Sequence, residues 1–173
     1  MRDPATDRVT VRDAAPADDP RIAAVAETCW RTAYADLLRE ETIDRALDAW
    51  YDEAVLRERV DGERTFLVVG AGAGDIVGYA SAGREAGEDG RGIHLGSIYV
   101  RPDRWGDGVG SALLSAFLET CRETGYDRVH AIALAENDRA CAFYRSRGFS
   151  LYEERESDLF GETVTDAEYV REV

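Results

Sequence analysis

The chain has 173 residues, of which 45% are apolar and 32% charged, and this is the length of one ordinary globular domain. It is too hydrophobic for a disordered chain and too charged for a membrane protein. The 35 acidic residues exceed the 21 basic ones by 14, which argues against the phosphate-neutralising surface that nucleic-acid binding needs. We therefore expect a single domain over residues 1–173, with no nucleic-acid and no membrane partner.

All 21 basic residues are arginine, lysine and glutamine are absent, and Asn137 is the only asparagine. Mutual repulsion among the excess acidic groups destabilises a compact chain in dilute buffer and is screened at molar salt. The composition predicts a halophile; a GC-rich genome would explain the loss of lysine but not the acidity. No signal peptide or run of 18 apolar residues is visible, so we expect a cytoplasmic protein.

The cysteines and histidines favour neither a disulfide framework nor a metal. Cys29, Cys121 and Cys141 are odd in number and lack CxxC spacing, so we expect buried thiols. His94 and His130 have no HExxH pattern around them, and we expect no metal site.

The first half of the chain predicts a strand, two helices and a hairpin. Residues 8–14 alternate with period two, and the Asp-Asp-Pro at 18–20 is typical of a helix start. Apolar residues at three- and four-residue steps over 22–37 and 43–55 predict two amphipathic helices. Two apolar runs, 66–69 and 76–82, flank the glycine-rich turn 70–75 and predict an antiparallel hairpin.

In the second half, the order of elements predicts a mixed α/β domain. A loop over 83–92 is followed by a strand over 94–100, a helix from Gly110 that Gly125 ends, a strand over 128–135 and a helix over 137–147. Runs at 149–155 and 163–170 predict a final antiparallel pair. We expect a central mixed, mostly antiparallel sheet flanked by helices, in the order β, α, α, β, β, β, α, β, α, β, β.

Three alternate glycines, Gly106, Gly108 and Gly110, stand between the predicted strand and helix. Glycines let backbone N–H groups turn toward an anion, and a helix N-terminus adds partial positive charge. This pattern suits a pyrophosphate.

A second segment, Asn137 to Phe149, reads N-x-x-A-x-x-F-Y-x-x-x-G-F. Together with the strand end IYV and the GDGVG turn followed by SALL, it strongly resembles the GNAT superfamily of N-acetyltransferases, which use acetyl-CoA. The resemblance is clearest from Leu95 to Phe149 and implies the acyl-CoA N-acyltransferase fold.

The resemblance also implies how acetyl-CoA is held. The backbones of Ile98 and Val100 would bond the pantetheine arm, the amides from Gly106 to Ser111 the pyrophosphate, and Asn137 the pantetheine region. The implied cofactor-binding set is Ile98, Tyr99, Val100, Arg104, Trp105, Gly106, Asp107, Gly108, Val109, Gly110, Ser111, Asn137, Arg139 and Tyr144.

Two features of the cofactor segment are particular to this chain. Trp105 stands where many members carry Gln or Arg, but the anion contacts come mainly from main-chain N–H groups, so we expect binding to persist. The acidity of the chain disfavours a tetra-anionic cofactor, so local arginines must offset it. The candidates are Arg101, Arg104, Arg139, Arg145 and Arg147.

Direct transfer to an amine needs a proton for the departing thiolate and a base for the amine. The resemblance places Tyr144 at the thioester sulfur, and a phenol with a pKa of about 10 can give that proton. The alternative is a core aromatic beside Phe143. His94, with an ordinary pKa of about 6.5, can serve as the base through water, although a strand-end histidine without a role fits equally. Glu27, Tyr34, Glu85 and Glu88 are other candidates.

The acceptor side is the least determined. Trp30 and Tyr34 resemble the W-x-x-x-Y pattern that some members place beside the acceptor, but core packing explains the same helical face. A catalytically idle acyl-CoA-binding or sensor module is the main alternative function, and G-x-G-x-G spacing disfavours a dinucleotide-binding domain. The identity of the amine, which is a small molecule or a protein amino group, and a homodimer are left open.

Overall fold

The computed structural model describes residues 9–62, 64–70 and 74–173, and seven strands of this part of the chain form one sheet. The strand order is β1-β2-β3-β4-β5-β7-β6; among these described strands β4 and β5 pair in parallel, and the other neighbours are antiparallel. The strands are β1 (Thr10–Asp13), β2 (Phe66–Gly70), β3 (Ile76–Ala86), β4 (Gly92–Val100), β5 (Arg128–Leu134), β6 (Ser150–Leu159) and β7 (Glu162–Glu172).

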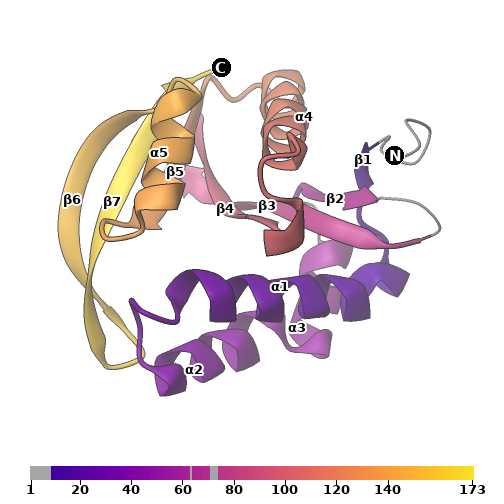
Figure 1. Ribbon diagram of the computed structural model, residues 1–173. Coiled ribbons are helices and arrows are strands. Elements are labelled where there is room, and N and C mark those ends of the chain that lie inside the picture. The colour runs from indigo at the N-terminus through magenta and orange to yellow at the C-terminus, as the bar shows by residue number, and fades with distance from the viewer. Residues whose placement is uncertain (1–8, 63, 71–73) are drawn as a thin grey trace.

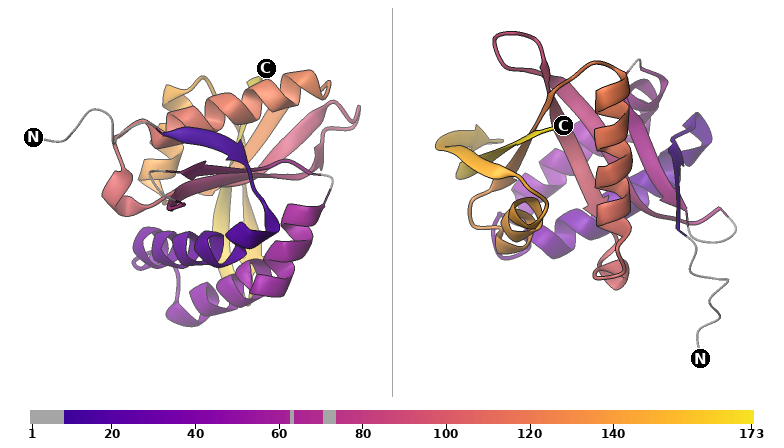
Figure 2. Two further views of the ribbon diagram at one scale, coloured as in Figure 1. Left: turned by 90° about the vertical axis from the view of Figure 1, so that its right-hand side faces the viewer. Right: turned by 90° about the horizontal axis from the view of Figure 1, so that it is seen from above.

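Five α-helices cover the two faces of this sheet (Figure 1). Helix α4 packs on one face, and α1, α2 and α3 lie together on the other, as the turned views show (Figure 2). The bounds are α1 (Asp19–Tyr34), α2 (Glu40–Tyr51), α3 (Glu53–Asp61), α4 (Val109–Glu123) and α5 (Asp138–Ser146), with short 3-10 turns at Pro16–Asp18 and Pro102–Arg104. The mixed, mostly antiparallel sheet flanked by helices is confirmed.

One part of the predicted order is wrong, because three helices instead of two stand between β1 and β2. The apolar pattern over 43–55 runs through a break at Asp52, whose backbone is extended with ψ 145°. The Asp52 carboxylate accepts a hydrogen bond from the Ala54 N–H at 3.2 Å and so caps α3. A capping side chain therefore starts a new helix without interrupting the hydrophobic periodicity.

Strand β3 is also longer than predicted, since it continues to Ala86 through residues that we expected to form a loop. Its pairing with β4 shifts register between Ser81 and Glu85. A Cβ at Gly83 would lie 3.3 Å from the Gly96 Cα, so two facing glycines allow the close approach at this irregularity. Half of the predicted turn 70–75, namely residues 71–73, lies outside the described residues, and so does residue 8 of the first predicted strand.

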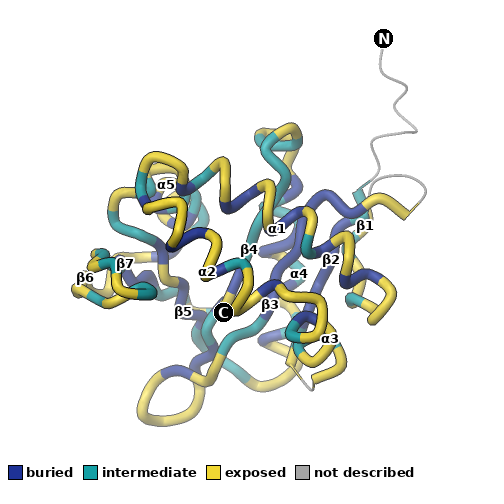
Figure 3. Tube along the Cα trace, turned by 90° about the horizontal axis from the view of Figure 1, so that it is seen from below, coloured by how far each residue is buried: buried dark blue, intermediate teal, exposed yellow. Residues whose placement is uncertain are grey.

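Two hydrophobic cores lie on the two faces of the sheet, and the central strands are buried between them (Figure 3). The core under α4 includes Leu113, Phe117 and Tyr169, and the core under α1 to α3 includes Ile22 and Tyr79. The three cysteines are buried free thiols, as predicted. Within the described residues, no helix is long and apolar enough to cross a membrane.

The feature that positions the candidate site is an opening inside the sheet. The described pairs of β4 with β5 run only from Gly92 with Arg128 to Leu95 with Ala131. Past Leu95, the second half of β4 continues beside β3 alone. One edge of β4 is thus without a partner strand in the middle of the molecule.

Candidate active site

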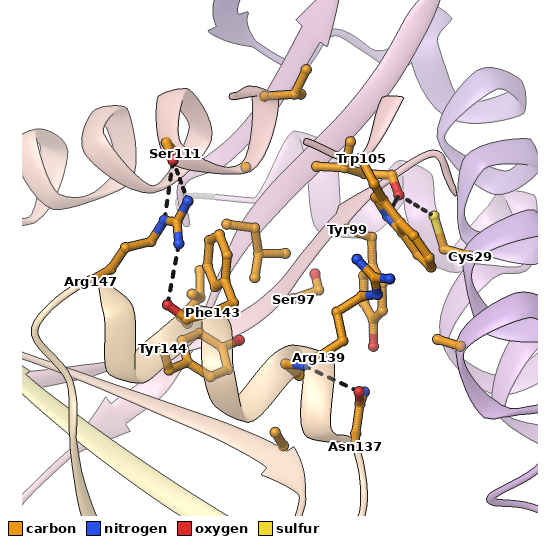
Figure 4. A pocket seen from close by; sticks show the side chains of 18 of the residues that line it. Cys29, Ser97, Tyr99, Trp105, Ser111, Asn137, Arg139, Phe143, Tyr144 and Arg147 are labelled. Atoms are coloured by element: carbon orange, nitrogen blue, oxygen red, sulfur yellow. Dashed lines mark hydrogen bonds between the residues drawn. The ribbon is translucent and has the colours of Figure 1, made fainter. Parts of the chain in front are cut away.

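A groove of about 550 Å³ lies at this opening, between the free half of β4, the start of α4, the helix α5 and the end of α1 (Figure 4). Most of the predicted site residues line it: Tyr34, Ile98, Tyr99, Val100, Arg104, Trp105, Gly106, Gly108, Val109, Gly110, Ser111, Asn137, Arg139 and Tyr144. Trp30, His94 and Asp107 are not among its lining residues. Residues that the sequence reasoning did not single out for the site also line it, among them Cys29, Ser97, Ile132 and Phe143.

The backbone of β4 presents free hydrogen-bonding groups to the groove. The Arg101 N–H donates to the Val77 carbonyl at 2.8 Å, so Tyr99, two residues earlier, exchanges its backbone bonds with Tyr79. The alternation of an antiparallel ladder then turns the N–H and C=O of Ile98 and Val100 away from β3. These are the two residues whose backbones the family resemblance assigns to pantetheine.

The Val100 carbonyl, however, has two donors of its own. It accepts from the Trp105 indole N–H at 2.9 Å and from the Cys29 thiol at 3.2 Å. Since a carbonyl oxygen has two lone pairs, both are engaged, and Val100 is left with its N–H for a ligand. The guanidinium of Arg139 lies 3.9 Å from the centre of the Trp105 ring and completes this wall of the groove.

The glycine-rich turn leads into the N-terminus of α4. Gly106 and Gly108 both have φ of +82°, a conformation that side chains disfavour, and a Cβ on either would meet no atom within 4 Å. The Ala112 N–H donates to the Gly108 carbonyl as the first bond of the helix. The N–H groups from Gly108 to Ser111 therefore have no partner within the helix, which is the arrangement that suits an anion.

Two members of the predicted turn have other roles. The Asp107 N–H donates to the Arg104 carbonyl at 3.4 Å and its carboxylate binds the Arg104 guanidinium at 2.9 Å, so Asp107 stabilises the turn itself. Gly110 lies inside α4, and a Cβ there would come within 3.0 Å of the Phe143 ring. The third glycine of the pattern thus allows α4 and α5 to pack closely.

Tyr144 lies on α5, is only 6% exposed, and lines the groove (Figure 4). Its ring packs against Phe143, Phe149 and Tyr169 with centroids 5.3 to 5.8 Å apart. Burial raises the pKa of Tyr144 well above its usual value, with a smaller contribution from Tyr34. The phenol is therefore protonated at neutral pH, while its ring also belongs to the core.

Tyr34 and Tyr99 meet on the α1 side of the groove, where their hydroxyl oxygens are 3.0 Å apart. Burial raises the pKa of Tyr34 to about 12, and hydrogen bonding to Tyr99 and Asn137 opposes the rise. Asn137 also caps α5, because its Oδ1 accepts from the Ala140 N–H at 3.2 Å. Trp30 is packed behind this pair, with its ring 4.6 Å from that of Tyr34 and 6.2 Å from that of Tyr99.

A series of buried, hydrogen-bonded side chains reaches the groove from α3 by way of β3. The Arg59 guanidinium donates to the Ser81 hydroxyl at 3.0 Å, and the Ser81 and Ser97 hydroxyl oxygens are 2.5 Å apart. Ser97 lines the groove, so this series links a cation on α3 to a hydroxyl in the site. The predicted strand pattern placed Ser81 and Ser97 on strands, but Arg59 comes from a helix that the sequence reasoning did not separate.

His94 lies next to the groove on β4 but outside it. Ile93 and Leu95 belong to the core under α4, so the imidazole of His94 points to the other face of the sheet, beside the His130 ring at 5.4 Å. His130 Nδ1 lies 2.8 Å from Glu168 Oε1, and Arg155 donates to the other oxygen of Glu168 at 2.9 Å. Burial lowers the pKa of His94, and Glu168 opposes that effect.

The remaining predicted bases lie elsewhere. Glu27 pairs with Arg31 on the surface of α1 at 3.3 Å, and Glu85 accepts from the Tyr126 hydroxyl at 3.2 Å. Glu88 is exposed in the loop after β3. Among the described residues that line the groove there is no carboxylate and no imidazole, and a base would have to act through bridging water.

Comparison with known proteins gives the family. Residues 24–149 match the model of the acetyltransferase (GNAT) family. An L-methionine sulfoximine/L-methionine sulfone acetyltransferase of Pseudomonas aeruginosa is 33% identical over 144 residues, which are 82% of this chain and 80% of that protein. A mycothiol acetyltransferase of Clavibacter sepedonicus is 32% identical over 113 residues, and the match spans 65% of this chain and 33% of that longer protein.

Solved structures share the fold. The PaiA N-acetyltransferase of Thermoplasma acidophilum, in complex with coenzyme A, has a TM-score of 0.80 at 18% identity and covers 96% of this chain and 99% of its own. A GCN5-related N-acetyltransferase of Rhodopseudomonas palustris has a TM-score of 0.77 at 24% identity, with 95% of each chain covered. The chain therefore belongs to the acetyltransferase (GNAT) family and is an acetyltransferase with acetyl-CoA as its acetyl donor.

Proposed function

We propose that this protein is an N-acetyltransferase that moves the acetyl group of acetyl-CoA to a primary amine by direct transfer in a ternary complex. One observation carries the proposal. The free edge of β4, the unpartnered N–H groups at the start of α4 and the Tyr144 side chain line a single groove. A strand edge, an anion site and a protonated phenol are what a linear phosphorylated thioester needs.

Each part of the groove has a role in holding the donor. The N–H groups from Gly108 to Ser111 bind the pyrophosphate, and the open backbone groups of Ile98 bond the amides of the pantetheine arm. Trp105 and Arg139 form the wall beside them. The thioester then lies at the deep end of the groove, near Tyr144.

In the transfer, the amine nitrogen forms a bond to the acetyl carbon while the carbon–sulfur bond breaks and the electron pair stays on sulfur. The Tyr144 hydroxyl gives its proton to that sulfur and regains one from solvent. The amine nitrogen loses a proton to a water molecule, which passes it to His94. Because burial keeps the pKa of His94 low, the imidazole is neutral and ready to accept at neutral pH.

The acceptor enters from the face of the sheet that α1 and α2 cover. The hairpin of β6 and β7 closes this side, since the Glu162 carboxylate accepts from the Arg39 N–H at 3.0 Å and from the Thr42 hydroxyl at 2.8 Å at the start of α2. A closed side favours a small amine over a long polypeptide. On this side the Tyr34 side chain lines the groove, and the buried Trp30 side chain packs behind it.

The test is release of free thiol from acetyl-CoA in the presence of single amines. The panel starts with L-methionine sulfoximine and L-methionine sulfone, which the name of the Pseudomonas relative specifies, and continues with other amino acids, polyamines and peptides. We expect amine-dependent thiol release and an acetylated product seen by mass spectrometry. Thermal stabilisation by acetyl-CoA but not by NAD, without thiol release from any amine, would contradict the enzyme and leave a binding protein.

That second function, an acyl-CoA-binding module without catalysis, has one observation in its favour. No carboxylate or imidazole lines the described groove, so the site contains no base in direct reach of an amine. The thiol-release panel separates the two functions. A cytoplasmic location, a salt-rich environment and a single domain over residues 1–173 remain proposals that accompany this function.

A further inference from the structure

A second cavity, of about 210 Å³, adjoins the groove at the start of α4. The two cavities share Ser111 and Arg147. The second continues along α4 through Ser115 and Arg122 and is bounded by Arg171 of β7. We call it the arginine pocket, and its full lining is Ser111, Leu114, Ser115, Leu118, Arg122, Arg147 and Arg171.

The charge of this pocket is opposite to that of the chain. The protein has an excess of 14 negative charges, and ten of its arginines pair with carboxylates. Within the described part of the chain, Arg122, Arg147 and Arg171 have no ion pair with a carboxylate, and no acidic side chain lines the pocket. Three arginines gathered without a counter-charge in so acidic a chain mark a site for an anion.

Two of the three side chains are held in place. Arg147 donates from Nε to the Ser111 hydroxyl at 3.1 Å and from Nη1 to the Ser146 hydroxyl at 2.7 Å, and its guanidinium lies 4.1 Å from the centre of the Phe143 ring. Arg171 donates from Nη1 to the Arg147 carbonyl at 2.7 Å. A guanidinium has five N–H donors. Arg147 also donates from Nη1 to the Phe143 carbonyl at 3.5 Å and from Nη2 to the Ser111 hydroxyl at 2.5 Å, which leaves it one N–H for a ligand, whereas Arg171 keeps four.

The pocket lies where the donor continues beyond its pyrophosphate. In coenzyme A the thioester, the pantetheine arm, the pyrophosphate and the adenosine follow one another, and the adenosine carries a phosphate monoester on its 3′ oxygen. If the pyrophosphate occupies the N–H groups that end at Ser111, the nucleotide leaves the groove beside Ser111 and Arg147. A phosphate monoester is the kind of anion that guanidinium groups bind with paired hydrogen bonds.

We propose that the arginine pocket binds the 3′-phosphate of coenzyme A, and that Arg122, Arg147 and Arg171 let the protein distinguish coenzyme A from 3′-dephospho-coenzyme A. This proposal rests on the proposed function, because it takes the donor to lie in the groove. It also explains how so acidic a protein holds a tetra-anionic ligand. The local positive charge faces the 3′-phosphate, which together with the pyrophosphate carries the negative charge of the ligand.

The test compares the two ligands, which differ only in that phosphate, by isothermal titration calorimetry at one fixed potassium chloride concentration. We expect coenzyme A to bind at least about tenfold more tightly than dephospho-coenzyme A, as befits charge-assisted bonds to a phosphate. In Arg122→Gln and in Arg171→Gln, the ratio of the two dissociation constants should fall several-fold. The dissociation constant of dephospho-coenzyme A should stay within about twofold of wild type.

Arg145→Gln is the matched control. Arg145 is on α5, lies over the Tyr169 ring at 5.6 Å, and lines neither cavity, so its loss removes the same charge and should leave the ratio unchanged. Arg122 is exposed on α4, so its substitution leaves the fold intact even if Arg171→Gln does not fold.

The outcomes separate the two proposals. Equal affinity of the wild type for both ligands, or an undiminished ratio in Arg122→Gln, would overturn the phosphate site and leave the groove assignment standing. A ratio that falls equally in Arg145→Gln would reduce the effect to net charge and would also overturn the site. Binding of neither ligand would overturn the proposed function, and the phosphate site with it.

Discussion

The indole N–H of Trp105 donates to the carbonyl of Val100 at 2.9 Å and so ties the glycine-rich turn to the end of β4. Trp105 is the residue at which this chain departs from the pattern of many family members. The hydrogen bond gives the departure a structural role, because it fixes the strand edge relative to the anion site.

The Trp105→Phe variant tests that role. It removes the N–H but keeps a ring for Arg139 to stack on, so we expect the affinity for coenzyme A to fall by about tenfold or less, in line with the roughly 1 kcal/mol of a neutral hydrogen bond. Calorimetry gives the dissociation constant. Trp50→Phe, at an exposed position on α2, is the control, and equal affinity in wild type and Trp105→Phe would contradict the role.

Tyr144→Phe separates proton donation from packing, because it removes one hydroxyl and leaves the ring among Phe143, Phe149 and Tyr169. Since burial raises the pKa of Tyr144, the phenol keeps its proton throughout the working range and can donate it. We expect kcat to fall by roughly 10² to 10⁴ with little change in the dissociation constant of acetyl-CoA. A variant with wild-type kcat would leave Tyr144 as a packing residue only.

The pH profile of kcat/KM tests His94. The imidazole is the base in its neutral form, and burial lowers its pKa, so activity should decline only at a pH below the ordinary histidine value of about 6.5. Four neighbours on other strands act on it: Glu168 raises its pKa, whereas His130, Arg84 and Arg155 lower it. Removing the carboxylate in Glu168→Gln should therefore move the acid limb to a still lower pH.

In His94→Ala the same acid limb should disappear and the rate should fall by about 10² or more at neutral pH. Amines of low pKa, which are already deprotonated, should recover part of the loss. An unchanged acid limb in His94→Ala would show that another group is the base.

Gly108 and Gly125 allow a matched test of the turn, because both have positive φ, +82° and +91°, at opposite ends of α4, and neither has an atom near its missing Cβ. Substitution by Asp should cost each about 1–2 kcal/mol of stability from the left-handed backbone. Only Gly108→Asp places a carboxylate at the proposed pyrophosphate site. Thermal melts with and without coenzyme A should therefore show a ligand shift in Gly125→Asp and none in Gly108→Asp, and equal shifts would contradict the turn assignment.

The excess of 14 negative charges predicts that stability rises with salt. Potassium chloride up to molar concentration screens the mutual repulsion, so the denaturant midpoint should increase from low to high salt. Sorbitol at matched osmolality does not screen charge and is the control. A midpoint that is independent of salt would count against the halophile proposal.

Much of this architecture could be read from local sequence, and what could not depends on contacts between distant segments. Alternation of apolar residues with period two predicted the strands, and apolar residues at three- and four-residue steps predicted most helices. Asp52, however, begins a helix by capping it within an unbroken apolar pattern. The alternate glycines marked the turn correctly, yet the need for Gly110 comes from Phe143, thirty-three residues away in the chain. No single-sequence pattern signals such a contact.

The same holds for the polar groups of the site. The motif pointed to Val100, but the competing donors on its carbonyl come from Trp105 and from Cys29 on α1. Likewise, Arg122 and Arg171 look like ordinary surface arginines in the sequence, and only the folded chain brings these residues of α4 and β7 to one pocket. Residues that are far apart in the sequence and meet only in the folded chain leave no local pattern that predicts their contact.

The opening between β4 and β5 changes what it costs to place a ligand inside a sheet. Strands that are paired along their whole length must break backbone hydrogen bonds before anything can lie between them. Here the ladder already ends at Leu95 and Ala131, and a narrow arm can lie between the strands without breaking any of it. The work of separating the strands is done when the chain folds, so the cavity is preorganised and the affinity of the ligand does not have to supply it.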